Sequence, residues 1–255
     1  MKIVSIIPAR MDSSRFPGKP LANILGIPMI GHCLKRSSMC SDVSATYVAT
    51  CDNEIKDYVN SIGGKAIMTS DKHVRATDRT AEAMLEIENI EGEEIDIVVM
   101  IQGDEPMLVP EMISSALEPI KKNPDIKVVN MYSDLKSVAE FNDPNEVKVV
   151  LDNEENALYF SREPIPSRKK GIDKVPMFKQ VCIIPFKRNF LLEFNEMEQT
   201  PLEIIESVDM LRVIENKESV KMVYSTHQTY SVDTQQDLEN VENLMKDDNL
   251  IDTYK

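Results

Sequence analysis

The most informative stretch of this sequence reads Ile6-Ile7-Pro8-Ala9-Arg10-Met11-Asp12-Ser13-Ser14-Arg15-Phe16-Pro17-Gly18-Lys19-Pro20-Leu21, an apolar strand that continues directly into a loop. The loop carries three cations, Arg10, Arg15 and Lys19, and one acid, Asp12, although the chain has a formal net charge of -14. Small residues let backbone N–H groups approach a ligand, and here they are Ala9, Ser13, Ser14 and Gly18. The pattern favours a polyphosphate ligand, and a solvated basic turn is the alternative.

Composition excludes several classes of protein. The acidic balance, with a pI near 4.8, argues against nucleic-acid binding, which needs a basic face over many phosphates. The sequence has no apolar run of 18 residues, and its start lacks the pattern of a signal peptide, so we expect a cytoplasmic protein without membrane attachment. Its 4 cysteines have no CxxC spacing, so we expect free thiols and no zinc or disulfide framework.

Short β-branched runs alternate with amphipathic stretches along the first half of the chain. The expected strands are 2–8, 45–49, 65–68 and 95–101, and the expected helices are 29–39, 54–62, 77–87 and 111–121. This alternation predicts an α/β fold with a doubly wound, mostly parallel sheet of the nucleotide-binding kind. Ligands of such sheets bind beyond the carboxyl ends of the strands.

The pattern changes after residue 127. Extended runs at 147–151, 157–160 and 178–186 predict a β-rich insertion over 128–186, which covers one end of the sheet or forms a subunit interface. Helices at 190–194 and 202–214, a strand at 220–224 and a last helix capped by Thr234 return the chain to the core. We therefore expect a single domain over 1–255, with a nucleotide-binding core at 1–127, the insertion at 128–186 and the return at 187–255.

Two acidic motifs, together with the cationic loop, predict a binding site. Gln102-Gly-Asp-Glu-Pro106 follows the buried strand 95–101 and places Asp104 and Glu105 at its carboxyl end, and Asp233 just precedes the last helix. Two carboxylates from distant segments, together with a cationic loop, are what a Mg²⁺–nucleotide site requires, because phosphates and waters complete the octahedron. The alternatives are an Asx turn for Asp104 and a helix cap or turn for Asp233.

Seven blocks of sequence, in order, resemble the 3-deoxy-manno-octulosonate (Kdo) cytidylyltransferase family, and they run nearly end to end. They are Arg10, Arg15–Leu21, Gln102–Pro106, Asn145–Asp152, Ala157–Arg162, Thr200–Glu203 and Val232–Thr234. The resemblance implies transfer of CMP from CTP to an acidic sugar acceptor, with release of pyrophosphate, as a step in polysaccharide biosynthesis. It also implies a nucleotidyltransferase fold and a homodimer formed through the β-rich insertion.

The resemblance assigns a role to each matching residue. Asp104 and Asp233 would hold Mg²⁺, and with Arg10 and Lys19 they would form the catalytic set. The nucleotide would be bound by Ala9, Arg10, Arg15, Lys19, Arg79 and Gln102. A surface helix cation is the alternative for Arg79. Phosphoryl transfer needs placement and charge neutralisation rather than a covalent nucleophile, so these residue types suit the reaction.

The acceptor segment departs from the family pattern. Where the family has His-x-Gly-x-Tyr-x-Tyr, this chain has Gln180, Ile184 and Phe186 in place of the His and the two Tyr. An Arg75-Ala76 pair replaces Ser-Gly. The acceptor-binding residues would then be Arg75, Gln180, Glu203, Glu206 and Met210, of which Met210 replaces a Gln and the two glutamates match. Because lost donors leave a polar ligand unpaired, we hypothesise a divergent pocket for a modified or smaller acid or a phosphonate. Lineage drift, with Kdo still bound, is the alternative.

Other functions fit the sequence less well. No G-x-x-x-x-G-K-[ST] occurs, which argues against a P-loop enzyme, and Pro8-Ala9-Arg10 stands where a dehydrogenase needs G-x-G-x-x-G. A nucleotide-binding homologue without catalytic activity stays open. The side chains alone do not decide between CTP and UTP.

Overall fold

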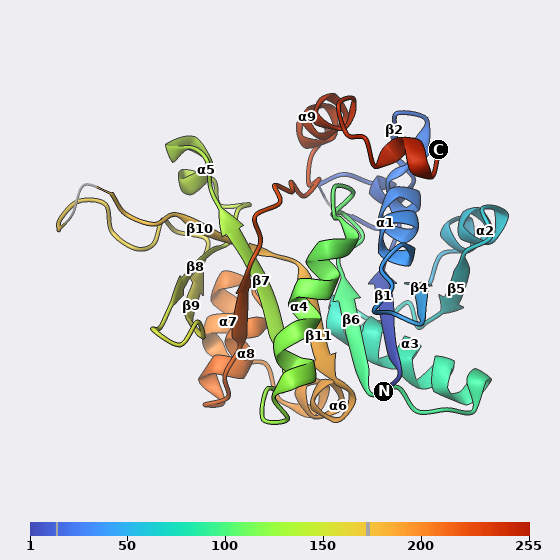
Figure 1. Ribbon diagram of the computed structural model, residues 1–255, viewed down its shortest axis with the longest axis horizontal. Helices are drawn as coiled ribbons and strands as arrows, with labels where there is room; N and C mark the ends of the chain where they lie inside the picture. Colours follow the sequence, from blue (N-terminus) through green and yellow to red (C-terminus); the bar gives the residue numbers. More distant parts are fainter. Residues whose placement is uncertain (14, 172–173) are drawn as a thin grey trace. The chain divides into compact units, whose positions relative to one another are not determined.

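The computed structural model describes residues 1–13, 15–171 and 174–255, so Ser14 of the cationic loop lies outside the described residues. The chain forms two compact units (Figure 1). Unit 1 joins Met1–Ser114 to Thr229–Lys255, and unit 2 is Ser115–Gln228. The β-rich segment expected at 128–186 lies within unit 2, which extends beyond it at both ends.

Unit 1 contains the parallel sheet that the sequence predicts. Its strands, in sheet order, are β6 (Ile97–Ile101), β1 (Ile3–Pro8), β4 (Ala45–Thr50) and β5 (Lys65–Met68). All three pairings are parallel. Every residue of β1 and β6 is buried, so both faces of the sheet centre are covered, as the unbroken apolar runs predict.

Helices and short elements surround this sheet. They are η1 (Lys19–Leu21), the hairpin β2 (Asn23–Ile24) and β3 (Ile27–Pro28), α1 (Met29–Ser38), α2 (Asn53–Ser61), α3 (Ala76–Glu91), α9 (Gln235–Met245) and η2 (Ile251–Thr253). Helix α4 (Pro110–Lys122) begins in unit 1 and continues into unit 2. Helix α9 begins as predicted, because Thr234 and Asp237 form a capping box.

Unit 2 contains a mixed sheet. Its strands, in sheet order, are β12 (Lys221–Tyr224), β7 (Val129–Asp134), β10 (Phe178–Val181), β8 (Lys148–Leu151) and β9 (Ala157–Ser161). Strand β12 is parallel to β7, whereas β10 is antiparallel to both β7 and β8. The other elements are β11 (Ile183–Lys187), α5 (Val138–Asn142), α6 (Arg188–Glu196), α7 (Pro201–Glu206) and α8 (Met210–Glu215).

Two expected elements of unit 2 are each divided in the structure. The run 178–186 forms two strands that break at Cys182, and the run 202–214 forms two helices. Helix α7 ends because Ser207 adopts the left-handed conformation, with φ 52°. That conformation usually marks a glycine, so the sequence gives no signal of the break.

The C-terminal segment of unit 1 is fastened to α1 by a chain of hydrogen bonds. Arg36 donates from Nε to the Tyr254 hydroxyl at 2.8 Å. The hydroxyl lies 2.8 Å from Nδ1 of His32, whose Nε2 lies 2.9 Å from the Ile24 carbonyl oxygen. The network is satisfied when the hydroxyl donates to Nδ1 and Nε2 carries the proton. His32 therefore has a structural role.

Candidate active site

The site lies where neighbouring parallel strands of unit 1 end. Strands β1 and β6 pair directly, so the cationic loop after β1 and the Gln102–Pro106 turn after β6 begin side by side. The turn packs closely against the end of β1, because a Cβ added to Gly103 would lie 3.0 Å from the Pro8 carbonyl oxygen. Asp104 follows this glycine at the sheet edge, where the fold is expected to bind ligands.

Lys19 joins the two predicted metal ligands. Its Nζ donates to Oδ2 of Asp104 at 2.7 Å and to Oδ1 of Asp233 at 3.2 Å. Arg15 also donates to Oδ1 of Asp233, at 2.9 Å. Residues that lie 85 and 214 positions from Lys19 along the chain thus meet at one ammonium group.

The local backbone explains how Lys19 reaches this position. Gly18, the N-cap of η1, has φ 75°, which glycine adopts without the cost that a Cβ imposes. Pro20 follows at the start of the short helix, where its missing N–H is not needed. The Gly-Lys-Pro order therefore turns the chain sharply at Lys19.

The three groups at the centre are largely withdrawn from water. The side chains of Lys19, Asp104 and Asp233 are 13%, 20% and 15% exposed. Burial alone would lower the pKa of Lys19, but the attraction of Asp104 and Asp233 outweighs it and raises that pKa. The lysine is therefore firmly protonated, and the site holds both signs of charge in a partly dry environment.

The carboxylates of Asp104 and Asp233 suit a metal ion that takes only some of its ligands from the protein. Among the described residues, no group of three or more His, Cys, Asp or Glu side chains is placed to hold an ion. Asp104 and Asp233 supply hard carboxylate oxygens and already share a cation, the Lys19 ammonium. Mg²⁺ is typically bound in this way, through one or two carboxylates, waters and substrate phosphates.

The remaining predicted nucleotide residues lie around the same loops of unit 1. Arg10 is exposed and donates to the His73 carbonyl oxygen at 3.5 Å, and Gln102 is half-buried. The Ala9 amide donates to the Ala49 carbonyl oxygen at 2.9 Å, so this N–H belongs to the sheet. Arg10 and Gln102 leave polar groups available beside the cluster.

Arg79 is not a surface cation, so that alternative is wrong. The residue is 2% exposed, and its Nη1 donates to the Thr69 hydroxyl at 2.5 Å. Its Nη2 is buried and has no hydrogen-bond partner among the described residues. A buried guanidinium nitrogen without an acceptor favours an anionic ligand at this position. Arg75 lies four residues before Arg79 in the sequence, as the N-cap residue of α3, and is half-buried.

The other predicted acceptor residues belong to unit 2. Gln180 donates to Oδ1 of Asn130 at 2.6 Å. Glu206 accepts from the Ser161 hydroxyl and the Arg162 amide, both at 2.8 Å. Both side chains are half-buried and retain some contact with solvent.

The side chains of Glu203 and Met210, in contrast, are buried. Glu203 is fully buried, and Arg212 donates to its two carboxylate oxygens at 2.8 and 2.6 Å. Glu203 is also the N3 residue of the α7 capping box. Met210 is 1% exposed. The sequence did not single out Arg212, and only the Thr200-Pro-Leu-Glu203 capping pattern hinted at the structural use of Glu203.

Two further buried residues of unit 1 lie close to the site, namely Glu105, which the sequence places with Asp104 at the end of the strand, and Thr229. Glu105 and Thr229 are 4% and 2% exposed, and the Thr229 hydroxyl donates to Oε2 of Glu105 at 2.7 Å. Both lie close in sequence to the aspartates of the site. The position of Glu105 within the Gln102–Pro106 motif was the available signal, whereas nothing in the sequence marks Thr229.

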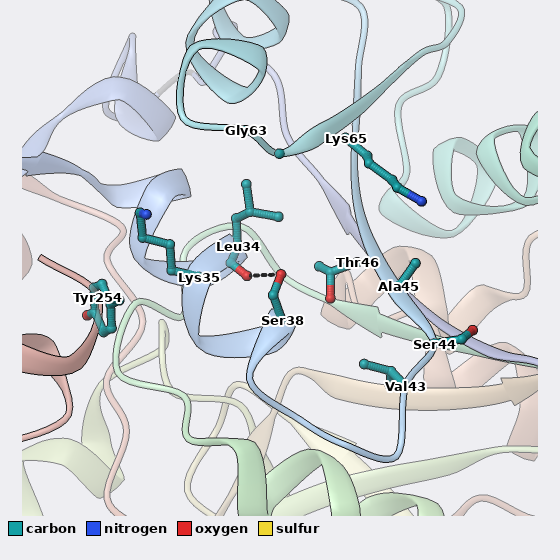
Figure 2. Close-up of a pocket in the computed structure, with 11 residues that line it drawn as sticks. Leu34, Lys35, Ser38, Val43, Ser44, Ala45, Thr46, Gly63, Lys65 and Tyr254 are labelled. Carbon is teal, nitrogen blue, oxygen red and sulfur yellow. Dashed lines mark hydrogen bonds between the residues drawn. The ribbon is translucent and has the colours of Figure 1, made fainter.

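A cavity of about 400 Å³ lies elsewhere in unit 1 (Figure 2). It adjoins the first residues of β4 and β5, at Ala45, Thr46 and Lys65, and is therefore at the opposite edge of the sheet from Asp104. Ser38 in its wall donates to the Leu34 carbonyl oxygen. None of the predicted site residues lines it.

A parallel sheet with acids and cations at its carboxyl edge is typical of α/β proteins that bind anionic ligands there. Residues 4–221 match the family model described as cytidylyltransferase, and the chain belongs to that family. It is therefore an enzyme of the nucleotidyltransferase class. None of the helices in the described part of the chain has the length and apolar character needed to cross a bilayer.

Several relatives are similar over almost their whole length. The 3-deoxy-manno-octulosonate cytidylyltransferase of Trichlorobacter lovleyi is 43% identical, with 96% of this chain and 99% of the relative covered. The enzyme of the same name from Fusobacterium nucleatum is also 43% identical, with 98% and 99% covered. A solved CMP:2-keto-3-deoxy-manno-octonic acid synthetase in complex with CTP has a TM-score of 0.87 at 36% identity, covering 96% of this chain and 99% of that one.

Proposed function

We propose that this chain transfers CMP from CTP to Kdo and releases pyrophosphate. The observation that carries the proposal is the Lys19 ammonium group, which Asp104 and Asp233 share at 2.7 and 3.2 Å. Relatives at 43% identity that carry the Kdo name favour Kdo over the altered acid suggested by Gln180 and its neighbours. The substitutions in that segment then reflect lineage drift.

The reaction joins an acceptor hydroxyl to the α-phosphorus of CTP. The new P–O bond forms as the bond to the bridging oxygen breaks, pyrophosphate leaves with the electron pair, and the hydroxyl proton passes to solvent. Arg10, Arg15 and Lys19 would bind the phosphates and offset the charge that develops on the leaving group. Arg79, through its unpaired Nη2, and Gln102 would add contacts to the nucleotide.

Asp104 and Asp233 would hold Mg²⁺ in this scheme. The bound ion would neutralise phosphate charge and make the α-phosphorus more electrophilic. The Lys19 ammonium would then turn from the carboxylates towards the triphosphate. This exchange keeps the charge of the site balanced, because each carboxylate gains a cation as it gives up another.

Acceptor recognition is assigned to Gln180 and Glu206 of unit 2, and the acceptor role of Arg75, in unit 1, stays a prediction of the family resemblance. Gln180 and Glu206 each have a half-buried side chain with polar groups, which suits a hydroxylated acid. Glu203 and Met210 are both buried, so we expect them to stabilise unit 2 rather than to contact the acceptor. Substitution of Gln180 or Glu206 should therefore raise the KM for Kdo more than the KM for CTP.

We also propose a cytoplasmic homodimer. The cytoplasm supplies CTP, and the apolar side chains that unit 2 exposes include Leu158, Ile204 and Ile205, at 56%, 58% and 74%. Exposed apolar surface of this kind is typical of interaction sites. Light scattering should give about twice the chain mass of 28.9 kDa. A mass of one chain at micromolar concentration would contradict the dimer.

The function is tested by following pyrophosphate release with purified protein and Mg²⁺. CTP with Kdo should give a kcat/KM of about 10⁴ M⁻¹s⁻¹ or more, and UTP or acids that lack the Kdo hydroxyl pattern should give far less. Gln180→Ala should raise the Kdo KM, whereas Gln236→Ala, which changes an exposed glutamine of α9, is the matched control. Turnover of another acid in preference to Kdo would contradict the proposed acceptor.

A further inference from the structure

We propose that Glu105 and Thr229 are positioning residues that hold Asp104 and Asp233 in the relative placement that a metal–nucleotide complex requires. The inference rests on the proposed function and adds to it a pair of residues that contact neither metal nor substrate. It follows from how two distant segments of unit 1 are joined. One is the turn after β6, and the other is the segment that leads into α9.

The first link is a buried side-chain hydrogen bond. The Thr229 hydroxyl donates to Oε2 of Glu105 at 2.7 Å, across 124 positions of sequence. Thr229 is 2% exposed and Glu105 is 4% exposed. A hydrogen bond to a carboxylate in a dry environment is stronger and more directional than one at the surface. The two segments are therefore held at a defined separation.

The second link joins the backbones of the same two segments. The Val232 amide donates to the Asp104 carbonyl oxygen at 3.0 Å. Each partner is one of the aspartates of the site or its direct neighbour in sequence. The side-chain link lies one residue beyond Asp104 on one segment and four residues before Asp233 on the other. Together the two links limit both sliding and rotation of one aspartate relative to the other.

The segment that follows Asp233 also holds this residue in place. Its amide donates to Oδ2 of Asp237 at 3.1 Å, and the same oxygen accepts from the Thr234 amide at 2.8 Å within the capping box. Helix α9 thus orients Asp233, and the Glu105–Thr229 bond fastens the segment before it to the turn that carries Asp104. Loss of that bond would leave Asp233 attached to its helix but less well placed against Asp104.

The chemistry of the site makes this placement important. Without the shared Lys19 ammonium, and before a metal ion takes its place, the two like-charged carboxylates would repel each other. Asp104 and Asp233 would hold Mg²⁺, an ion that tolerates little departure from octahedral coordination, so their relative placement would affect how well it binds. The Glu105–Thr229 hydrogen bond lies outside the coordination sphere, so it would resist this repulsion without occupying a coordination position. Partners of this kind generally have large effects on metal affinity.

The test compares Thr229→Val, which removes the hydroxyl at nearly constant shape, with Thr229→Ser, which restores it. Ser44→Ala is the matched control, because the Ser44 hydroxyl also makes one short bond, to the Ile3 carbonyl oxygen at 2.7 Å, at the amino edge of the sheet. Three quantities are measured for each protein. The first is the Mn²⁺ affinity in the presence of a non-hydrolysable CTP analogue, measured by electron paramagnetic resonance. The second is the steady-state kinetics, given as kcat and the KM for CTP. The third is the rate of hydrogen exchange at the Val232 amide.

Thr229→Val should weaken Mn²⁺ binding and lower kcat by about tenfold each, while the CTP KM changes less than twofold, because the phosphate-binding cations are intact. Hydrogen exchange at the Val232 amide should be faster in Thr229→Val. In Thr229→Ser, the Mn²⁺ affinity, kcat and this exchange rate should return to within about threefold of the wild-type values. A lower unfolding temperature with unchanged Mn²⁺ affinity and kcat would overturn the inference and leave only a structural role.

Failure of the proposed function has a different signature. Wild-type protein that releases no pyrophosphate from CTP and Kdo would contradict the proposed reaction. The exchange rate at Val232 in Thr229→Val would still report whether the bond holds the two segments together. An unchanged rate there would overturn the positioning role whatever the reaction.

Discussion

The Nζ atom of Lys19 lies 2.7 Å from Oδ2 of Asp104 and also reaches Asp233, so one buried ammonium group offsets two carboxylates. Removing that ammonium should turn the pair into a simple cation site. In Lys19→Met, 10 mM Mg²⁺ without nucleotide should raise the unfolding temperature by about 2–4 °C, because the ion binds the folded state only. Thermal unfolding with and without Mg²⁺ measures the effect.

Lys35→Met is the control for this experiment, since it removes a lysine from α1 away from the aspartates. Neither the control nor the wild type should show a comparable Mg²⁺ effect. An identical response of all three proteins would mean that Asp104 and Asp233 do not form a cation site.

Neutralising either aspartate should abolish catalysis without unfolding the protein. Asp104→Asn and Asp233→Asn should each lower kcat by about 100-fold or more, because an amide oxygen is a poorer ligand and carries no charge. Asp12→Asn makes the same change in net charge at an exposed acid of the cationic loop and should retain nearly full activity. Wild-type turnover in either aspartate variant would remove that residue from the site.

The buried ion pair between Glu203 and Arg212 should contribute to stability rather than to catalysis. Glu203→Gln leaves the Arg212 guanidinium, which is 3% exposed, without its charged partner, and should cost about 3–5 kcal/mol of unfolding free energy. Chemical denaturation measures this loss. The double variant Glu203→Leu with Arg212→Met should recover part of it, since it removes both charges together.

The same variant tests the role that family resemblance gives to Glu203. At a temperature where Glu203→Gln is folded, its KM for Kdo should stay within about twofold of wild type, because Arg212 occupies both carboxylate oxygens. A tenfold higher Kdo KM in folded protein would instead place Glu203 at the acceptor.

Acid should destabilise the fold through His32. Burial lowers the pKa of His32 and outweighs the hydrogen bond to the Ile24 carbonyl oxygen, which acts in the opposite direction, and the positive charge of Arg36 adds to the lowering. A folded-state pKa below the unfolded value of about 6.5 means that this contribution to stability is complete above pH 6.5. It is lost as the pH falls through 6.5 towards the lower folded-state value.

Unfolding temperatures between pH 8 and pH 5 measure this effect. The wild type should lose stability relative to His32→Gln as the pH falls, by at most about 1.4 kcal/mol per pH unit. His227→Gln, which changes an exposed histidine, should follow the wild type. Parallel curves for the wild type and His32→Gln would show that His32 does not titrate in this range.

Much of unit 1 could be predicted because its signals are local. Apolar runs of β-branched residues gave the strands β1, β5 and β6 to within two residues, and the Thr234–Asp237 capping box gave the start of α9. The rule that ligands bind at the carboxyl ends of parallel strands predicted that Asp104 lies near the loop of Lys19, whereas Asp233 was joined to them through magnesium chemistry and the family resemblance.

Contacts between distant segments could not be predicted in the same way. The Glu203–Arg212 and Glu105–Thr229 bonds join residues whose types fit many surface positions, and only the folded chain brings them together. The break at Ser207 depends on a left-handed backbone at a residue that rarely adopts it. Burial of Arg79 likewise depends on packing, which periodicity alone does not reveal.

The most direct test of the proposed reaction is ³¹P NMR of the protein with CTP, Mg²⁺ and Kdo. We predict that the CTP resonances are replaced by equal amounts of pyrophosphate and a new phosphodiester between CMP and Kdo. Intact CTP in the presence of folded protein and Kdo, or its conversion to free CMP without a phosphodiester, would contradict the account.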